Sequence, residues 1–277
     1  MQTVLQKAVA GNKKAMIQLY NSTKQRVYYV AKLLLQDDAM AESATIWVYR
    51  FGWGEIKTLE LETVAEFEKL MLQRVVGYCK KRTIKHNSKA FHVPENRNFN
   101  IKIVDSIKMD KKSLEEMVLN QFSDLQRYIY VLHTIAKYED SEIESVVNLK
   151  GQILQLAINA ESRNMDVILQ AVGMASLADY KDITLKIIDT VNSIQVPQRV
   201  DDEVNKVIEQ IVKPIIEKER KKRNWILTIV VNICIIFIGL GLLLAEKNSN
   251  IDEYETEKAN NTQVEENIES EVEIVTE

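Results

Sequence analysis

The chain has 277 residues, of which 27% are charged, and a formal net charge of −4 at pH 7. Cys79 and Cys234 have no CxxC context, and Cys234 falls in a strongly apolar run, so a fold stabilised by their disulfide is excluded. His86, His92 and His133 lack the spacing of a metal site, and no Gly-rich phosphate loop, GxSxG or HExxH motif occurs. We therefore expect no cofactor, no metal and no enzymatic activity.

Apolar residues recur at helical spacing almost throughout, which predicts an all-α fold. We expect two small helical domains, extra amphipathic helices, one transmembrane helix and a disordered tail. The first domain, residues 1–88, contains two apolar stripes that predict core-facing helix sides rather than ligand sites. One stripe comprises Val27, Val30, Ala31 and Leu34, and the other comprises Val64, Phe67, Met71, Val75 and Tyr78.

The polar segment 89–112 contains Pro94 and follows a basic stretch, which predicts a linker. The second domain, residues 113–160, contains three predicted helices. The first covers Leu125 to Lys137, Ser141 caps the second through Val147, and the third follows a turn at 148–151 and ends near Ala160. This is a helix-turn-helix pattern, although any three-helix bundle produces a similar one.

The last of these helices has a polar side that is a candidate for reading DNA. This side comprises Lys150, Gln152, Gln155 and Asn159. Glutamine and asparagine can bind the major-groove edge of adenine. A single lysine, however, supplies little of the phosphate attraction that dominates DNA affinity.

Positive charge is concentrated earlier, in residues 74–112, where eleven Lys or Arg residues face three acidic ones. We expect Tyr78 to stack on an unpaired base while neighbouring cations neutralise phosphates. These cations are Arg74, Lys80, Lys81, Arg82 and Lys85. A solvated helix end followed by a basic linker is an equally open interpretation.

Further helices are predicted over 161–196, and a juxtamembrane helix over 197–224. The latter has an apolar stripe of Val204, Val207, Ile208, Ile211 and Ile215. Three roles remain open for this stripe: it docks on the chain's own helical domains, it pairs two copies, or it forms a stalk.

Residues 225–245 carry no charge, and a helix of this length spans about 31 Å, enough to cross a bilayer. Basic residues dominate the flank before this run, whereas residues 246–277 hold eleven acids against two lysines. The positive-inside rule then predicts a single-pass protein of the cell membrane, with its N-terminal 224 residues in the cytoplasm. The acidic segment 246–277 is expected to be a disordered extracytoplasmic tail.

Several motifs occur in a recognisable order between about residues 7 and 160. An opening with a Leu-Tyr pair is followed by an acidic stretch, and both resemble region two of the extracytoplasmic-function sigma factors of bacterial RNA polymerase. The matching residues are Gly11, Ala15, Leu19, Tyr20, Asp38, Ala41 and Glu42. The segment FEKLMLQRVVGYCKKR resembles the promoter-melting helix, and residues 122–160, with Glu142 and Ile143, are similar to region four.

The resemblance implies a membrane-tethered regulator that binds RNA polymerase core and promoter DNA to direct transcription initiation. It also implies that Glu42, Trp47 and Arg50 face the polymerase. The sequence departs from the family pattern at Ser43, Ile46 and Trp47. An alternative is therefore a degenerate sigma-like interaction module at the membrane, with an anti-sigma or partner-sequestering role and no promoter binding.

Two further possibilities remain open at this point. The basic segments can bind anionic lipid instead of DNA, at about 1 kcal/mol per cation near a charged surface. An anti-sigma or envelope-sensing protein is an additional candidate partner.

Overall fold

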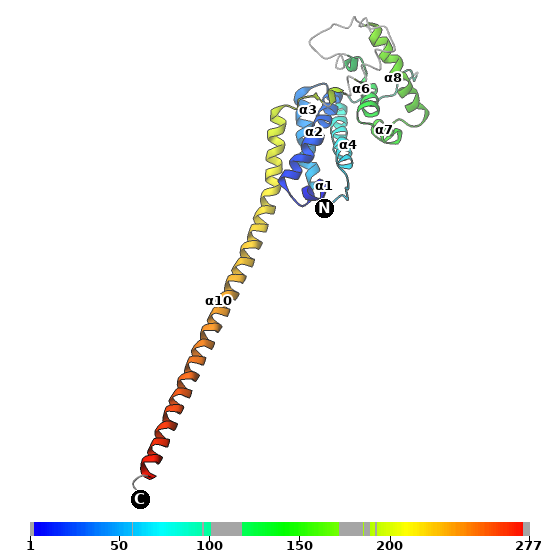
Figure 1. Ribbon diagram of the computed structural model, residues 1–277. Helices are drawn as coiled ribbons and strands as arrows, with labels where there is room; N and C mark the ends of the chain where they lie inside the picture. The colour runs from blue at the N-terminus through cyan, green and yellow to red at the C-terminus, as the bar shows by residue number, and fades with distance from the viewer. Residues whose placement is uncertain are drawn as a thin grey trace. The chain divides into compact units, whose positions relative to one another are not determined.

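The computed structural model describes residues 3–56, 58–95, 97–100, 118–171, 185, 189–191 and 193–273, with side chains placed as far as residue 240 except at residue 162. The elements in this part of the chain are all helical, which confirms the predicted all-α class (Figure 1). Residues 101–112 of the expected linker lie outside the described residues. The same holds for 172–184, 186–188 and 192, which fall within the further helices expected over 161–196.

Four helices form the N-terminal bundle: α1 (Val4–Val9), α2 (Lys13–Leu35), α3 (Asp38–Glu55) and α4 (Val64–His86). A side chain caps the start of each one, and Thr3 and Thr63 do so as complete capping boxes. Helix α2 ends where Gln36 adopts a left-handed conformation with φ 54°. This break lets α3 turn back against α2, which also contacts α1 and α4 and is thus the central helix.

Aromatic side chains make up much of the interior of this bundle. Trp53 of α3 stacks on Phe67 of α4 with ring centroids 5.2 Å apart, and Tyr20 meets Tyr49 edge-on at 4.8 Å. The Tyr49 hydroxyl is hydrogen bonded to Thr23 at 2.7 Å, so its polar end is satisfied inside the core. Both predicted stripes contribute to this core, although Val64 is exposed and Tyr78 is only half-buried.

A second group contains α6 (Asp124–Tyr130), a π-helical turn η1 (Val131–Ile135), α7 (Asp140–Val147) and α8 (Gln152–Ala171). It has the order of elements predicted for the helix-turn-helix, but the boundaries need correction. Helix α7 begins after Glu139, not Ser141, because Glu139 forms a capping box with Glu142. Helix α8 continues eleven residues beyond Ala160, since Met165, Ile168 and Leu169 extend its buried side.

The two groups, which correspond to the two small helical domains expected from the sequence, belong to one compact unit, Met1–Lys213. Their buried residues form one continuous cluster. The segment after α4 contributes to it, because Phe91 packs on Tyr128 of α6 with ring centroids 4.8 Å apart. Thr83 and Tyr128 are also hydrogen bonded at 3.0 Å.

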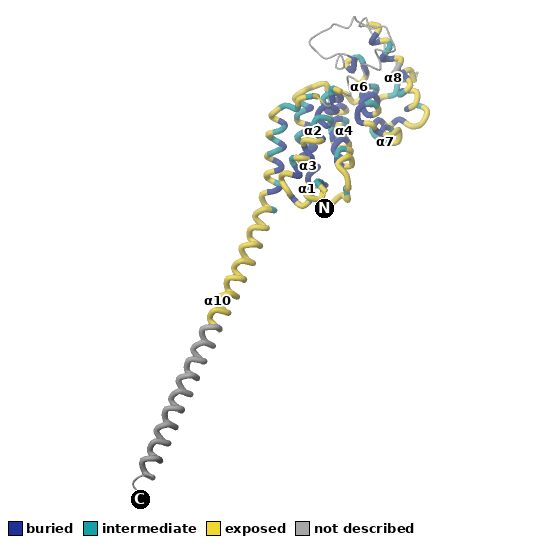
Figure 2. Tube along the Cα trace, viewed as in Figure 1, coloured by how far each residue is buried: buried dark blue, intermediate teal, exposed yellow. Residues whose placement is uncertain are grey.

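Helix α10 (Gln198–Glu273) begins within this unit. Its first turns have one buried side, visible as the dark patches before the exposed remainder in Figure 2. The buried residues are Val200, Val204, Val207, Ile208 and Val212. Of the three roles open for this stripe, the structure therefore shows docking on the chain's own helices.

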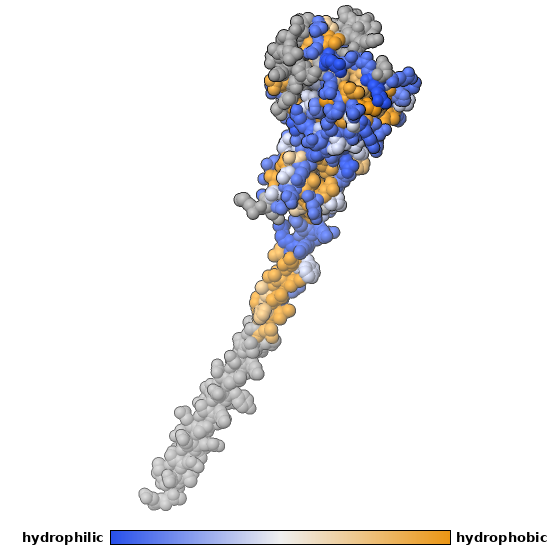
Figure 3. Space-filling model, turned by 90° about the vertical axis from the view of Figure 1, so that its right-hand side faces the viewer, coloured by the Kyte–Doolittle hydropathy of each residue, from blue (hydrophilic) through white to orange (hydrophobic). Residues whose placement is uncertain are grey.

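The second unit, Pro214–Glu277, starts at a proline within α10. From Trp225 to Leu240 its large apolar side chains are exposed, and Figure 3 shows them as a continuous apolar surface. Within the described residues, the helical stretch from Gln198 to Leu240 is long and apolar enough to cross a membrane. By length and composition, this stretch is a candidate transmembrane helix.

The backbone of residues 246–273 continues α10, which corrects the prediction of a disordered tail. High net charge and few large apolar residues predicted disorder. Residues 246–273 contain no Gly or Pro, however, and Glu and Lys have high helix propensity, so nothing in the local sequence ends the helix.

Candidate nucleic-acid interface

One exposed side of α4 gathers the basic residues predicted to bind DNA. Arg74, Lys81, Arg82 and Lys85 are exposed, and Tyr78 and Lys80 are half-buried. Residues 74, 78, 81, 82 and 85 share one side because three or four positions correspond to about one helical turn. The regular spacing of α4 thus places an aromatic ring among cations.

Tyr78 is part of an aromatic cluster that also contains Trp47 and Phe51 of α3. Its ring centroid lies 5.1 Å from that of Trp47, and Trp47 lies 4.7 Å from Phe51. The Arg82 guanidinium lies 5.3 Å from the Tyr78 ring centroid and donates a 3.1 Å hydrogen bond to the Tyr78 hydroxyl. These contacts fix the orientation of the Tyr78 ring at the surface.

A hollow of about 220 Å³ adjoins this cluster, between the start of α3 and α4. Its lining combines an aromatic ring, a guanidinium, a thioether and a hydroxyl, which suits a flat, polar-edged group. The lining residues are Ala39, Met40, Ser43, Tyr78 and Arg82. Aromatic rings and arginines of this kind stack on unpaired bases without strong sequence preference.

Not all of the predicted cations are equally available. Arg74 forms a 2.7 Å ion pair with Glu55, and Lys80 lies 5.7 Å from the centroid of the Phe91 ring. Among the described residues, Lys81 and Lys85 have no ion-pair partner within 4.0 Å. We therefore expect Lys81, Arg82 and Lys85 to contribute most to phosphate attraction.

The three residues expected to face the polymerase differ in their contacts and exposure. Trp47 contacts Tyr78 and so lies in the aromatic cluster. Glu42 is mostly buried and lies 3.4 Å from Arg199 of α10. Arg50 is exposed.

The predicted base-reading residues Lys150, Gln152, Gln155 and Asn159 lie on or just before α8. Lys150, Gln152 and Gln155 are exposed. Gln155, however, donates a 2.5 Å hydrogen bond to Asp140 of α7. Among the described residues, no hydrogen bond or ion pair joins this set to the α4 cations. The structure therefore presents two candidate surfaces rather than one.

The charge around α8 opposes DNA binding at that surface. Residues 118–160 contain five acids and three bases, and four of the acids lie at 139–144, on or next to α7. Glu144 accepts a hydrogen bond from the Gly151 amide at 2.8 Å, which holds an acid at the start of α8. Phosphate backbones are repelled by such a surface.

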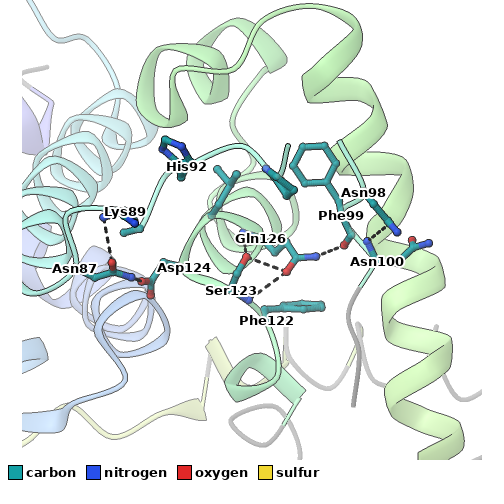
Figure 4. Close-up of a pocket in the computed structure, with 13 residues that line it drawn as sticks. Asn87, Lys89, His92, Asn98, Phe99, Asn100, Phe122, Ser123, Asp124 and Gln126 are labelled. Carbon is teal, nitrogen blue, oxygen red and sulfur yellow. Dashed lines mark hydrogen bonds between the residues drawn. The ribbon is translucent and has the colours of Figure 1, made fainter. Parts of the chain in front are cut away.

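Sequence reasoning missed a polar hollow of about 500 Å³ between the segment 87–100 and the start of α6 (Figure 4). Asn87 donates to Asp124 at 2.9 Å, and Gln126 donates to the carbonyl of Phe99, so much of its polar lining is already paired. Asn164 of α8 donates to the same carbonyl at 2.8 Å. Isolated amides of this kind have no sequence signature.

An ionisable pair joins the π-helical turn to α8. His133 of the π-helical turn is 3.4 Å from Glu161, whose side chain is 9% exposed. The hydrogen bond to Glu161 raises the pKa of His133, and burial raises the pKa of Glu161. Glu161 Oε1 has no hydrogen-bond partner among the described residues. His133 is thus one half of an ion pair between the π-helical turn and α8.

The described residues contain no group of three or more His, Cys, Asp or Glu side chains that could hold a metal ion. Cys79 is fully buried, and burial raises the pKa of its thiol. A buried thiol with a raised pKa is a poor nucleophile.

No protein-family model, curated protein or solved structure matches the chain.

Proposed function

We propose that this protein is a membrane-tethered transcription regulator of the extracytoplasmic sigma type, which binds nucleic acid and RNA polymerase core. The observation that carries the DNA-binding part is the side of α4 on which Tyr78 is flanked by Trp47 and Arg82. Exposed aromatic and cationic groups in this arrangement favour single-stranded or locally melted DNA over an intact duplex.

Each residue on this side of α4 has a distinct role. Lys81, Arg82 and Lys85 attract phosphates, and Tyr78 supplies the ring on which an unpaired base stacks. Trp47 packs against the Tyr78 ring. We therefore propose that Trp47 supports the nucleic-acid site and does not contact polymerase. Glu42 and Arg50 remain the proposed polymerase contacts.

The helix-turn-helix has a smaller role in this proposal. Its surroundings are acidic, and Gln155 is engaged by Asp140. We expect Lys150, Gln152 and Asn159 to adjust sequence preference at most, because the phosphate attraction that holds a duplex in place is weak there.

The membrane part of the proposal rests on α10 and its flanks. The apolar run is preceded by Lys218, Arg220, Lys221, Lys222 and Arg223 and followed by an acidic segment. The positive-inside rule then retains residues 1–224 in the cytoplasm, where DNA and polymerase are found.

The test uses residues 1–213, because this is the compact unit and a shorter chain would remove the buried stripe of α10. Binding to single-stranded, forked and duplex promoter DNA is measured over a salt series, together with co-purification with core polymerase. We expect forked and single-stranded DNA to bind most tightly. The absence of both DNA binding and polymerase binding would refute the proposal.

A second candidate, the sigma-like interaction module, is favoured by one observation. Glu42 is already paired with Arg199 of the same chain, and α7 is acidic. A module of this kind would bind a protein partner with little dependence on salt and would not bind DNA. The same salt series distinguishes the two candidates.

A further inference from the structure

The first turns of α10, residues 198–212, run antiparallel to α2, since Asp201 meets Lys24 and Glu209 meets Lys13. The centre of this contact is Asp201. It accepts hydrogen bonds from the Tyr20 hydroxyl at 2.6 Å and from Lys24 at 2.8 Å. The side chains of Lys24 and Asp201 are only 21% and 20% exposed, so this pair is largely shielded from water.

Two further ion pairs lie toward the ends of the contact. Arg199 is 3.4 Å from Glu42 of α3, and Glu209 is 2.8 Å from Lys13 at the start of α2. Between them, the buried side of α10 supplies an unbroken aliphatic stripe. The opposite side of the same turns is exposed at Asp202, Lys206 and Gln210, so α10 is held from one side only in the described part of the chain.

These contacts define which kind of helix can bind to the face formed by α2 and α3. The occupant is an amphipathic helix with aliphatic residues at i, i+4, i+7, i+8 and i+12, counted from Val200. It carries a cation at i−1, opposite Glu42, and carboxylates at i+1 and i+9, opposite Lys24 and Lys13. A protein helix with this order of charges fits the face, whereas a nucleic-acid backbone places no cation opposite Glu42.

Of the two polar residues assigned above to polymerase contact, Glu42 lies in this contact, whereas Arg50 is exposed. Glu42 is paired with Arg199. A partner that binds through Glu42 therefore has to replace its contact with Arg199 of residues 198–212.

We infer that residues 198–212 are a built-in competitor for a protein partner of the α2–α3 face, and that the partner binds by displacing them with a helix of matching chemistry. This inference rests on the proposed function, in which that partner is core polymerase. A tethered competitor acts at an effective concentration in the millimolar range. The apparent affinity of the partner falls in proportion to the fraction of molecules in which α10 is undocked.

The experiment uses the full chain in detergent and measures its affinity for core polymerase. Asp201→Ala removes the central contact and is expected to raise the affinity about tenfold by increasing the undocked fraction. Hydrogen exchange of residues 198–212 should accelerate in the same variant. Asp202→Ala is the matched control, because the exposed Asp202 accepts a hydrogen bond from Gln198 of its own helix, and it should leave both measurements unchanged.

A locked form tests the opposite direction. Lys24→Cys and Asp201→Cys, combined with Cys234→Ser, are joined by a reducible thiol cross-linker, while buried Cys79 stays unreactive. We expect the cross-linked chain to lose polymerase binding and to regain it on reduction. Equal binding by the cross-linked and reduced forms would overturn the inference while leaving polymerase binding intact. If neither form nor the Asp201→Ala variant binds, the proposed polymerase contact fails as well.

Discussion

The orientation of the Tyr78 side chain depends on a contact with Trp47, a residue far from it in the sequence. The position of Tyr78 beside basic residues predicted a stacking role from sequence. Its contact with Trp47, 31 positions away, was not predictable, because nothing in the sequence indicates which side of α3 meets α4. The contact matters because a ring held in one orientation loses less conformational entropy when a base stacks on it.

Tyr78→Ala is expected to weaken binding of single-stranded DNA by about 5- to 100-fold, the range for loss of one base–aromatic stack. Tyr78→Phe keeps the ring and loses only the hydrogen bond from Arg82, so its affinity should stay within about twofold of the wild type. Fluorescence anisotropy with a labelled oligonucleotide measures both. Equal losses in the two variants would contradict a stacking role.

His133 and Glu161 give the stability of the first unit a dependence on pH. The folded-state pKa of His133 is raised above its ordinary 6.5, so its stabilisation is complete below about pH 6.5 and is lost as the pH rises through the folded-state value. Glu161 changes the stability in the same direction, but at lower pH. Burial favours the neutral form of its carboxyl group in the folded protein and so raises its pKa, and its contribution to stability is therefore also lost as the pH rises.

We therefore expect the melting temperature of residues 1–213 to fall between pH 6 and pH 8, and His133→Gln to remove about 1–2 °C of that fall, since half-exposed ion pairs contribute at most about 1 kcal/mol. Thermal melts at several pH values measure this. His86→Gln is the control, because His86 is exposed at the end of α4. A pH dependence unchanged in His133→Gln would show that other groups cause it.

Among the helices, α4 and α8 are the two candidate DNA-binding elements, and their charges distinguish them. Replacing Lys81 and Lys85 by Ala should reduce the salt slope of single-strand binding by about 1.4, at about 0.7 per phosphate contact. Replacing Lys7 and Lys14, exposed on α1 and α2, should leave the slope unchanged. Replacing Lys150 and Gln152 should alter affinity by less than about threefold, and a larger loss there would move the main site to α8.

The aliphatic stripe of α10 was predictable from the sequence, but the helices against which it packs were not. Val204 is fully buried, so Val204→Ala should destabilise residues 1–213 by about 1–3 kcal/mol through lost burial and the remaining cavity. Gln210→Ala on the exposed side should change stability by less than about 0.5 kcal/mol. Urea unfolding measures both. Similar stabilities for the two variants would contradict docking of this helix.

The residues at which helices begin and end were less predictable from the sequence than the presence of the helices. The residues that cap α4 and α7 are ordinary polar residues with several equivalent candidates nearby, and the packing of the following turn selects one of them. The π-helical turn at Val131–Ile135 has no sequence signal at all. His133 within this turn contacts Glu161 of α8.

At the scale of the whole molecule, the prediction concerns the membrane. In a background with Cys79→Ser and Cys234→Ser, a cysteine introduced at Ser270 should react with an impermeant maleimide in intact cells, and one introduced at exposed Lys14 should react only after lysis. Labelling is read by mass shift on a gel. Labelling of both positions in intact cells would place the N-terminal unit outside.

Sequence alone was sufficient for the helical class, the apolar span, the charge difference across it and the basic side of α4, because each depends on composition or on periodicity within one segment. Only the tertiary structure decided that the two helical groups share one core. It also decided that Trp47 supports Tyr78 and that the aliphatic stripe after Pro197 docks on α2. The physical reason is common to all three. A helix's amphipathic pattern specifies that one side must be buried, whereas the identity of the covering surface depends on contacts between residues far apart in the chain.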